Sequence, residues 1–366
     1  MKYICPQCGR VSKDGNQWCQ EIFCPAENSL EILDDGEWFS DIEVIKPLTV
    51  LRSSVIYVAQ RAKSMVLLKV AHDGMQERLK REAALLLEIS KHGQVLGFPT
   101  LLSAYEQAPV GDFPYGRVVL RGKEKYYEVM AYEDGALLRN ILLKNPQPWF
   151  QQVGWITMSI ADALLIMHQN KRVNLCLNPD SILVRFDKQN FPRVKLLDLG
   201  VAAELSQVAK FWDPHFNFPS YTAPELVRMK GELGAASEVY NIGLILYEML
   251  AGRPAFEFKL RKDADIYRAV LQNDAEPTGR SDLKNIPQIA QKAVSRKYAN
   301  RQPDVLTFTR ELQPLFLPLP VEKRGFKINW RYIGIVLGVA LAISLLLALA
   351  LTFPGQQVSL TTTPVP

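Results

Sequence analysis

Four of the five cysteines lie within the first 24 residues of the chain. In Cys5-Pro-Gln-Cys8 two residues separate the thiols, so both thiolates can reach one metal ion, and Gly9 permits the tight turn that this requires. Cys19 and Cys24 supply a second pair of ligands. Four cysteine ligands complete the tetrahedral shell of Zn²⁺ and leave no position for a reactive water. The spacing therefore predicts a structural zinc site.

The spacing C-x2-C-x10-C-x4-C makes residues 1–28 resemble a zinc ribbon, although four residues instead of two separate the second pair. Two disulfides or four free thiols are the alternatives, and iron in a rubredoxin-like site is a third. The cytoplasmic location that the C-terminal part of the sequence predicts, as described below, disfavours disulfides. The clustering of the cysteines disfavours free thiols. We therefore expect zinc to be bound.

A second set of residues that could do chemistry is charged. Lys69 lies in a run of β-branched and apolar residues, 64–71, which predicts a strand, and a helix follows. Glu82 comes three residues after Leu79 and four before Leu86, so its carboxylate lies on the apolar face of that helix, where it needs a cation. A surface glutamate is the alternative. An ion pair with Lys69 would hold the fold closed.

Ordered motifs across residues 45–318 resemble the Ser/Thr protein kinases, nearest to the bacterial membrane-anchored type. The strand with Lys69 resembles the V-A-I-K motif, and Glu82 stands where the family places the partner of that lysine. Asp198 follows a strand as the aspartate of D-F-G does. The other motifs correspond to Val129–Tyr132 (the hinge, with Met130 as gatekeeper), Ala223–Glu225 (A-P-E), Arg301 (the partner of Glu225) and Glu238–Gly243 (the start of a central helix).

This resemblance implies an α+β fold of two lobes, with a small β-rich N-lobe at 45–131 and a larger helical C-lobe at 132–318. In the family, a cleft between the lobes binds ATP and Mg²⁺. The matching positions in this chain are Lys69, Glu82, Met130, Tyr132, Ser181 and Asp198.

The phosphate-binding loop of the family, G-x-G-x-x-G, has no glycine left in this chain. Thr49, Leu51 and Ser54 stand at the three glycine positions. Side chains at these positions hold the backbone amides away from the phosphates. Leu67 replaces the small alanine of V-A-I-K and crowds the place of the adenine ring. These changes argue against ATP and Mg²⁺ as cofactors.

The stretch that resembles the catalytic loop, 173–184, has lost its working groups. Cys176 replaces the aspartate that serves as the base, and a thiol with a reference pKa of about 8.5 is mostly protonated at neutral pH. Asn178 replaces the phosphate-contacting lysine, Ser181 the Mg²⁺-binding asparagine, and Phe218 the activation-segment threonine. We therefore expect no catalytic residue and interpret Cys176 as a packing residue. A reactive thiol is the alternative.

The segment 332–353 runs for 22 residues without a charged side chain. A helix of this length spans about 33 Å, which is enough to cross a bilayer. A buried helix of the soluble domain is the alternative. The basic residues before the segment are Lys323, Arg324, Lys327 and Arg331, and no charged residue follows it. The positive-inside rule then places the N-terminal bulk of a single-pass cell-membrane protein in the cytoplasm.

Three shorter segments complete the predicted organisation. They are a linker at 29–44, a basic juxtamembrane linker at 319–331 and a short tail outside the membrane at 354–366. The tail is too short and too polar to fold. Within the span Gly334, Gly338 and Ala342 recur every fourth residue, which lets two helices approach closely. This pattern favours a homodimer, although such patterns also arise by chance.

We interpret the chain as a membrane-tethered pseudokinase that acts as a scaffold or regulator of cytoplasmic proteins. The alternative is an active Ser/Thr protein kinase, or an ATP-binding switch, that transfers phosphate from ATP to protein hydroxyls with an atypical catalytic loop. The retained Lys69, Glu82 and Asp198 support this alternative. With 43 Lys+Arg against 38 Asp+Glu the net charge is only +5, and without a long basic run no nucleic acid is expected as a partner.

Overall fold

The computed structural model describes residues 2–6, 9–12, 16–21, 24, 26, 29–93, 96–229, 233–257, 261–283, 285–318 and 343–344. The chain divides into two units, residues 1–319 and 320–366, and in the second unit only residues 343–344 are described, both of them helical. The rest of the predicted span at 332–353, with Gly334, Gly338 and Ala342, lies outside the described residues, and so do its flanks at 319–331 and 354–366.

The first unit begins with a three-stranded antiparallel sheet in the order β2-β1-β3. Its strands are β1 (Lys2–Ile4), β2 (Val11–Ser12) and β3 (Leu30–Ile32). Ile4, Ile32 and Leu33 belong to the same apolar cluster as the core of the larger sheet that follows. The backbone N–H of Leu33 also donates to the hydroxyl of Tyr57 at 3.1 Å. The N-terminal sheet therefore shares its core with the N-lobe.

The stretch 29–44 is folded, and the prediction of a linker there is wrong. Besides β3 it contains β4 (Trp38–Phe39) and the first residues of β5 (Ile42–Val50). Phe39 and Ile42 are fully buried. The acidic residues and glycine of this stretch suggested a connector, but these few apolar side chains are enough to bury the segment against the N-lobe.

The N-lobe is built on a seven-stranded sheet in the order β4-β5-β6-β7-β10-β8, with β9 paired to β10. The remaining strands are β6 (Ser54–Arg61), β7 (Ser64–Ala71), β8 (Leu101–Leu102), β9 (Gly116–Leu120) and β10 (Lys123–Ala131). Side chains alternate between faces along a strand. On β6, Val55 and Tyr57 join the core shared with the N-terminal sheet, whereas Ile56 and Val58 join a cluster with C-lobe residues. The sheet is thus covered on both faces.

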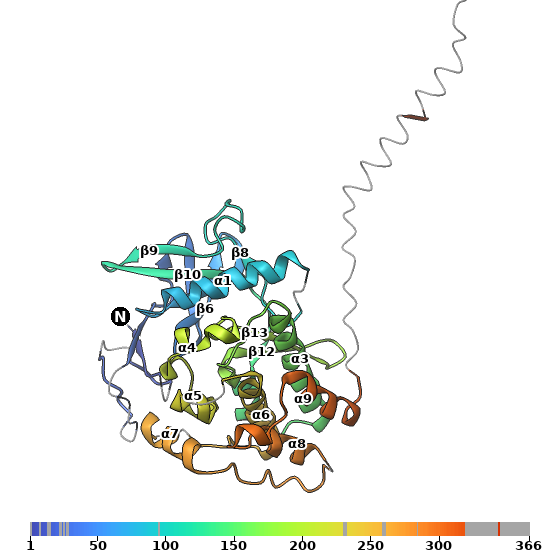
Figure 1. Ribbon diagram of the computed structural model, residues 1–366. Helices are drawn as coiled ribbons and strands as arrows, with labels where there is room; N and C mark the ends of the chain where they lie inside the picture. The colour runs from blue at the N-terminus through green and yellow to red at the C-terminus, as the bar shows by residue number, and fades with distance from the viewer. Residues whose placement is uncertain are drawn as a thin grey trace, which may run out of the picture. The chain divides into compact units, whose positions relative to one another are not determined.

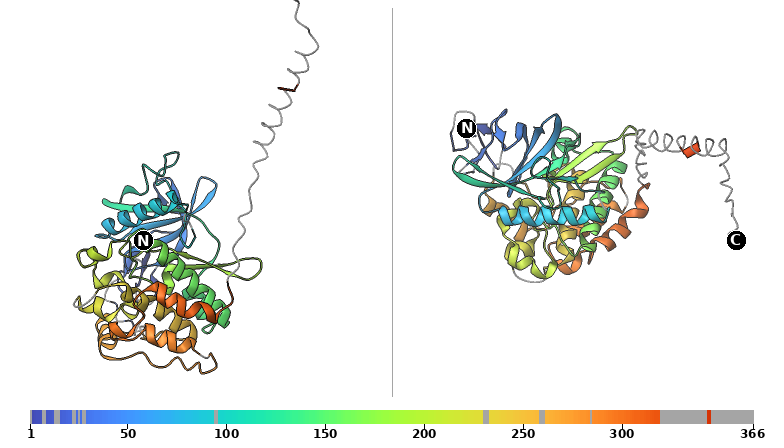
Figure 2. Two further views of the ribbon diagram at one scale, coloured as in Figure 1. Left: turned by 45° about the vertical axis from the view of Figure 1, so that its right-hand side comes forward. Right: turned by 90° about the horizontal axis from the view of Figure 1, so that it is seen from above.

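Helix α1 (Gln76–Lys91) packs on β8 and β10 of this sheet. Its buried Leu85, Leu86 and Ile89 belong to the main core of the C-lobe, so α1 connects the two lobes. Figure 1 shows α1 between the β-rich lobe and the helical lobe. Figure 2 shows the two lobes from two further sides, with the strands coloured blue to teal and the helical lobe green to orange.

The C-lobe is organised around α6 (Ala235–Ala251), which is buried along almost its whole length, including its polar residues Ser237, Glu238, Asn241 and Glu248. The other helices are α2 (Leu138–Lys144), α3 (Phe150–Gln169), α4 (Val208–Phe211), α5 (Pro224–Arg228), α7 (Asp263–Gln272), α8 (Ile286–Ala293) and α9 (Val305–Leu312). Helices α3, α8 and α9 pack directly on α6. A small sheet of β11 (Ala136–Leu137), β12 (Ile182–Phe186) and β13 (Pro192–Leu196) lies beside them.

Within the described part of the chain one helix, α3, is long and apolar enough to cross a membrane by composition. It packs against α6, α9 and β13, and 61% of its most apolar stretch is buried. These contacts make α3 a core helix of the C-lobe.

Candidate functional site between the lobes

Three of the residues predicted for the cleft meet between the lobes. The ammonium group of Lys69 on β7 lies 2.6 Å from a carboxylate oxygen of Glu82 on α1 and 3.7 Å from Asp198, which follows β13. It also donates to the backbone carbonyl of Leu197 at 3.0 Å. All of these charged side chains are at most 4% exposed. Burial lowers the pKa of Lys69, but the surrounding carboxylates raise it by more, so the amine stays charged.

Arg78 belongs to the same cluster, and sequence reasoning missed it. It lies on α1 one turn before Glu82, and its Nη2 donates to both carboxylate oxygens of Asp198, at 3.0 and 2.9 Å. The backbone N–H of Gly200 donates to Asp198 Oδ1 at 2.9 Å. Burial would raise the pKa of Asp198, but Arg78 and Lys69 hold it at about 2. The carboxylate is therefore charged and already neutralised by the protein.

Glu128 on β10 is the third buried carboxyl group, and sequence reasoning missed it as well. It is the cross-strand partner of Lys69, with one oxygen 3.9 Å from the ammonium group. Glu128 is fully buried, and in the described structure neither of its oxygens has a hydrogen-bond partner. Burial raises its pKa well above the usual range, which favours the protonated form of Glu128. The cluster therefore contains two cations, Lys69 and Arg78, and three buried carboxyl groups.

Beside these charges, apolar side chains from both lobes form one closed cluster. Its buried members are Leu51, Ile56, Val58, Leu67, Met130, Leu137, Leu183 and Leu197, each at most 5% exposed. Close-packed interiors leave no room for a ring system without moving side chains. Of the two hinge residues predicted to bind nucleotide, Met130 is part of this cluster, whereas Tyr132 lies outside it and is 38% exposed.

The connection between β5 and β6, where the family has its phosphate loop, contacts the C-lobe. The hydroxyl of Thr49 donates to the backbone carbonyl of Asp180 at 3.1 Å. The guanidinium of Arg52 forms two hydrogen bonds to Asp263 at the start of α7, at 2.9 and 3.0 Å, and lies 5.2 Å from the centre of the Phe218 ring. These contacts fasten the loop over the region where phosphates would enter.

Cys176 packs in the second core cluster of the C-lobe and is 1% exposed. Burial raises the pKa of this thiol to about 12, so it is protonated at neutral pH and cannot accept a proton. The hydroxyl of Ser181 donates to the backbone carbonyl of Asn178 at 2.9 Å. Both side chains therefore serve the conformation of the loop.

Asparagines hold the same loop in place. The side chain of Asn174 accepts from the N–H of Cys176 at 2.9 Å and donates to the carbonyl of Asp198 at 2.9 Å. The side chain of Asn178 accepts from the N–H of Asp180 and donates to the carbonyl of Cys176, both at 3.0 Å. Each of these four bonds joins an asparagine side chain to the backbone. The two asparagines therefore hold the loop in shape at positions where the family has catalytic groups.

The pair predicted from the A-P-E motif is formed. Arg301 binds Glu225 with two parallel hydrogen bonds of 2.7 and 2.9 Å, and both side chains are buried. The guanidinium also lies 4.5 Å from the centre of the Tyr240 ring on α6. Arg301 thus connects α5 to the central helix, because it binds Glu225 on α5 through a bidentate pair and lies over Tyr240 on α6.

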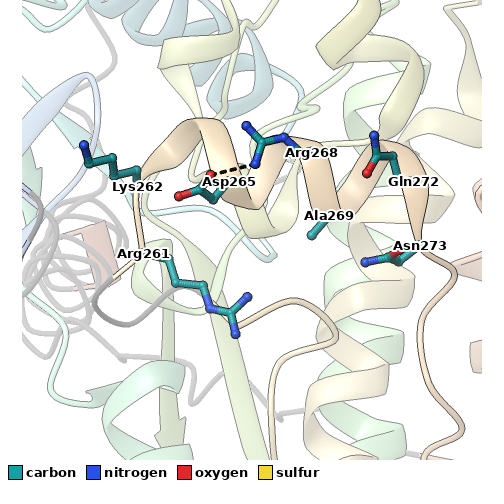
Figure 3. Close-up of a pocket in the computed structure, with 7 residues that line it drawn as sticks. All are labelled: Arg261, Lys262, Asp265, Arg268, Ala269, Gln272 and Asn273. Carbon is teal, nitrogen blue, oxygen red and sulfur yellow. Dashed lines mark hydrogen bonds and ion pairs between the residues drawn. The ribbon is translucent and has the colours of Figure 1, made fainter.

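Two surface hollows are present in the described structure, and neither lies among the residues of the closed cluster. One is lined by residues of α7 and its approach, and the other by residues between β7 and β10. Figure 3 shows that Arg261, Lys262 and Arg268 of the α7 hollow point in different directions, and Arg268 is paired with Asp265 at 3.0 Å. These cations do not converge on one ligand.

The described cysteines of the N-terminal segment lie together. The sulfurs of Cys5, Cys19 and Cys24 are all within 4.8 Å of one another, and Cys8 lies outside the described residues. The Cys5 and Cys24 sulfurs are 3.6 Å apart, which excludes a disulfide between them. Burial and the neighbouring thiols raise the pKa of Cys24 to about 11. Sulfurs at this separation fit a tetrahedral ion with Zn–S distances of about 2.3 Å.

A two-lobed fold with a lysine–glutamate pair between the lobes is that of a protein kinase. The family model of the protein kinase domain matches residues 54–307, and the chain belongs to this family. Crystal structures of the Mycobacterium tuberculosis PknI kinase domain share the fold. A double mutant of that domain superposes with a TM-score of 0.54 at 18% identity, covering 78% of this chain and 99% of the domain.

Curated relatives include Ser/Thr kinases. The serine/threonine-protein kinase PknB of Mycobacterium leprae is 27% identical over 51% of this chain, and PknB of Mycobacterium tuberculosis is 24% identical over 63%. Protein lin-2 of Caenorhabditis elegans is 30% identical over 39% of this chain. The matches span 29%, 36% and 14% of the lengths of these three relatives, which is well under half of each.

Proposed function

We propose that this member of the protein kinase family is a pseudokinase that acts as a scaffold or regulator by binding cytoplasmic proteins. The pair of Arg78 with Asp198 carries the proposal. The D-F-G aspartate of active kinases binds Mg²⁺. Here both oxygens of Asp198 accept hydrogen bonds from a buried guanidinium. A metal ion would have to displace Arg78 from Asp198, and breaking a buried ion pair costs about 3–5 kcal/mol.

The other groups needed for phosphate transfer support the same conclusion. Cys176 stands at the position of the base and has a pKa of about 12. Loss of a general base lowers a rate by roughly 10²- to 10⁴-fold. Leu67 and Met130 lie in the closed apolar cluster, so the place of the adenine ring is filled. Weak nucleotide positioning would lower the rate further.

One observation favours the alternative of an active Ser/Thr kinase or ATP-binding switch. The ion pair of Lys69 with Glu82 is formed at 2.6 Å, as phosphate transfer in this family requires. The same pair is explained by structure, since Lys69 also binds the carbonyl of Leu197 and balances buried carboxylates.

Phosphate transfer distinguishes the two functions. The full-length chain, incubated with labelled ATP and Mg²⁺ or Mn²⁺, is expected to label neither itself nor a general protein acceptor above the level of its Asp198→Asn variant. Melting curves of both proteins would show that each is folded. Labelling by the wild type that disappears in Asp198→Asn would establish the active kinase instead.

We propose that Cys5, Cys8, Cys19 and Cys24 bind a structural zinc ion. Support comes from the spacing of the four cysteines and from the three described sulfurs, which lie within 4.8 Å of one another. A bound zinc ion would cross-link residues 1–28, and with four thiolate ligands it would have no open coordination position.

We also propose that residues 332–353 cross the cell membrane once, with the kinase-family domain on the cytoplasmic side and residues 354–366 outside. The 22 uncharged residues and the basic residues before them support this topology. Gly334, Gly338 and Ala342 would allow two copies to pair within the membrane.

A further inference from the structure

Two large apolar side chains are exposed together on one side of the C-lobe. Trp149, just before α3, is 55% exposed, and Leu317, after α9, is 63% exposed. Trp155 links them, because its ring lies 5.6 Å from that of Trp149 and its Nε1–H donates to the carbonyl of Leu317 at 2.7 Å. Phe191 contacts the other side of Trp155, with ring centres 4.8 Å apart. We call these four residues the exit face.

The exit face lies where the described chain leaves the C-lobe. Helix α9 packs beside α3, as Figure 1 shows, and the described residues of the C-lobe end at Pro318, next to Leu317. Residues 319–331 then lead to the proposed span at 332–353. Thirteen residues reach at most about 43–47 Å when fully extended. If the span is inserted, Leu317 therefore lies within about 50 Å of the bilayer.

The chemistry of the exit face suits the headgroup region of a membrane. Tryptophan is enriched at that depth because its ring is apolar and its N–H is polar. Lys188 is exposed in the turn that leads to Phe191. Four more basic residues lie between 319 and 331. Each basic residue near an anionic cytoplasmic leaflet adds electrostatic attraction to the membrane surface.

We propose that the exit face rests on the anionic cytoplasmic leaflet, with Trp149 and Leu317 inserted among the lipid headgroups. This inference rests on the proposed membrane tether. This contact would define the orientation of the C-lobe relative to the membrane, because the side with the exit face would lie against the lipid. The α7 surface and the N-lobe then remain available to cytoplasmic proteins.

Photocrosslinking of the full-length chain in anionic vesicles tests this orientation. Benzoylphenylalanine would replace Trp149 in one variant, Leu317 in a second and Trp38, which is 60% exposed on β4, in a matched control. The proposal expects a several-fold excess of lipid adducts at Trp149 and Leu317 over Trp38. Equal lipid labelling at the three positions, or adducts to a second copy of the chain in place of lipid, would overturn it.

Alkaline carbonate extraction of the same vesicles separates this inference from the tether. Release of the wild-type chain by carbonate would overturn the membrane span and the exit-face proposal together. Retention of the chain without excess lipid adducts at Trp149 and Leu317 would leave the tether intact and overturn the exit-face proposal alone.

Discussion

Replacing Lys69 with methionine is expected to destabilise the folded chain by about 3–5 kcal/mol, the usual result of removing one partner from a buried ion pair. Lys69 is 1% exposed and is the cation nearest to Glu82 and Glu128. Methionine keeps most of the volume but leaves Glu82 buried without its counterion. The loss is therefore electrostatic and not a cavity effect.

Urea denaturation of the full-length chain in detergent, followed by circular dichroism, measures this loss. Lys80→Met on α1 is the matched control, since the pair of Lys80 with Glu77 is more exposed, at 28% and 68%. Exposed pairs contribute about 0–1 kcal/mol. The double variant Lys69→Met/Glu82→Leu should recover most of the stability, because it buries no unpaired charge. Similar losses for Lys69→Met and Lys80→Met would contradict the structural role of this pair.

Replacing Cys5, one of the proposed zinc ligands, is the second change with a large expected effect. Cys5 is 1% exposed and follows Ile4 on β1. If the Cys5→Ser variant loses zinc, the end of β1 loses its cross-link to the segment with Cys19 and Cys24, and we expect Ile4 and Ile32 to leave the core of the N-lobe. Burial of each such side chain contributes about 1.5–3 kcal/mol, so we expect a loss of about 3–6 kcal/mol. Chelation of zinc from the wild type should act in the same direction.

Metal analysis and urea denaturation of the same protein preparations check this expectation. The wild type should hold one equivalent of zinc and Cys5→Ser almost none. Cys176→Ala changes a buried cysteine outside the cluster and should keep the full equivalent. A wild-type zinc content under about half an equivalent would contradict the proposed site, since a closed four-thiolate site binds its ion tightly.

The sequence predicted the residues whose role depends on local pattern. The run of β-branched and apolar residues at 64–71 predicts a strand, and helical periodicity predicts the inward position of Glu82; the structure has β7 at Ser64–Ala71 and Glu82 buried on α1. The two-lobed fold follows from ordered motifs, and the family comparison confirms it. Glu225 and Arg301, 76 residues apart, could be paired in advance because both stand at positions that the family defines.

The contacts that close the cleft could not be predicted. Arg78 and Asp198 are 120 residues apart, and Arg52 and Asp263 are 211 apart. Arg78 stands at no family motif and Arg52 stands at a variable position of the phosphate loop, so only the folded chain shows which carboxylate each of them meets. Glu128 lies in β10, whose sequence does not alternate between polar and apolar residues, and its register opposite Lys69 depends on how β10 pairs with β7.

The linker prediction at 29–44 is wrong for a related reason. A short polar stretch with a glycine is typical of a connector. Whether this stretch folds depends on Phe39 and Ile42, which are buried only because the N-terminal sheet and the N-lobe share one core. Periodicity over such short strands carries too little signal to reveal that core.

Binding of ATP and Mg²⁺ by the folded full-length chain tests the closed cleft most directly. A ligand at ten times its Kd stabilises the native state by about 1.4 kcal/mol, which is measurable as a rise in Tm. With Arg78 on Asp198 and the apolar cluster closed, we predict no change in Tm at millimolar ATP and Mg²⁺. A rise in Tm that grows with ATP concentration and disappears without Mg²⁺ would contradict the account, because it would require both a nucleotide in the cleft and a metal ion on Asp198.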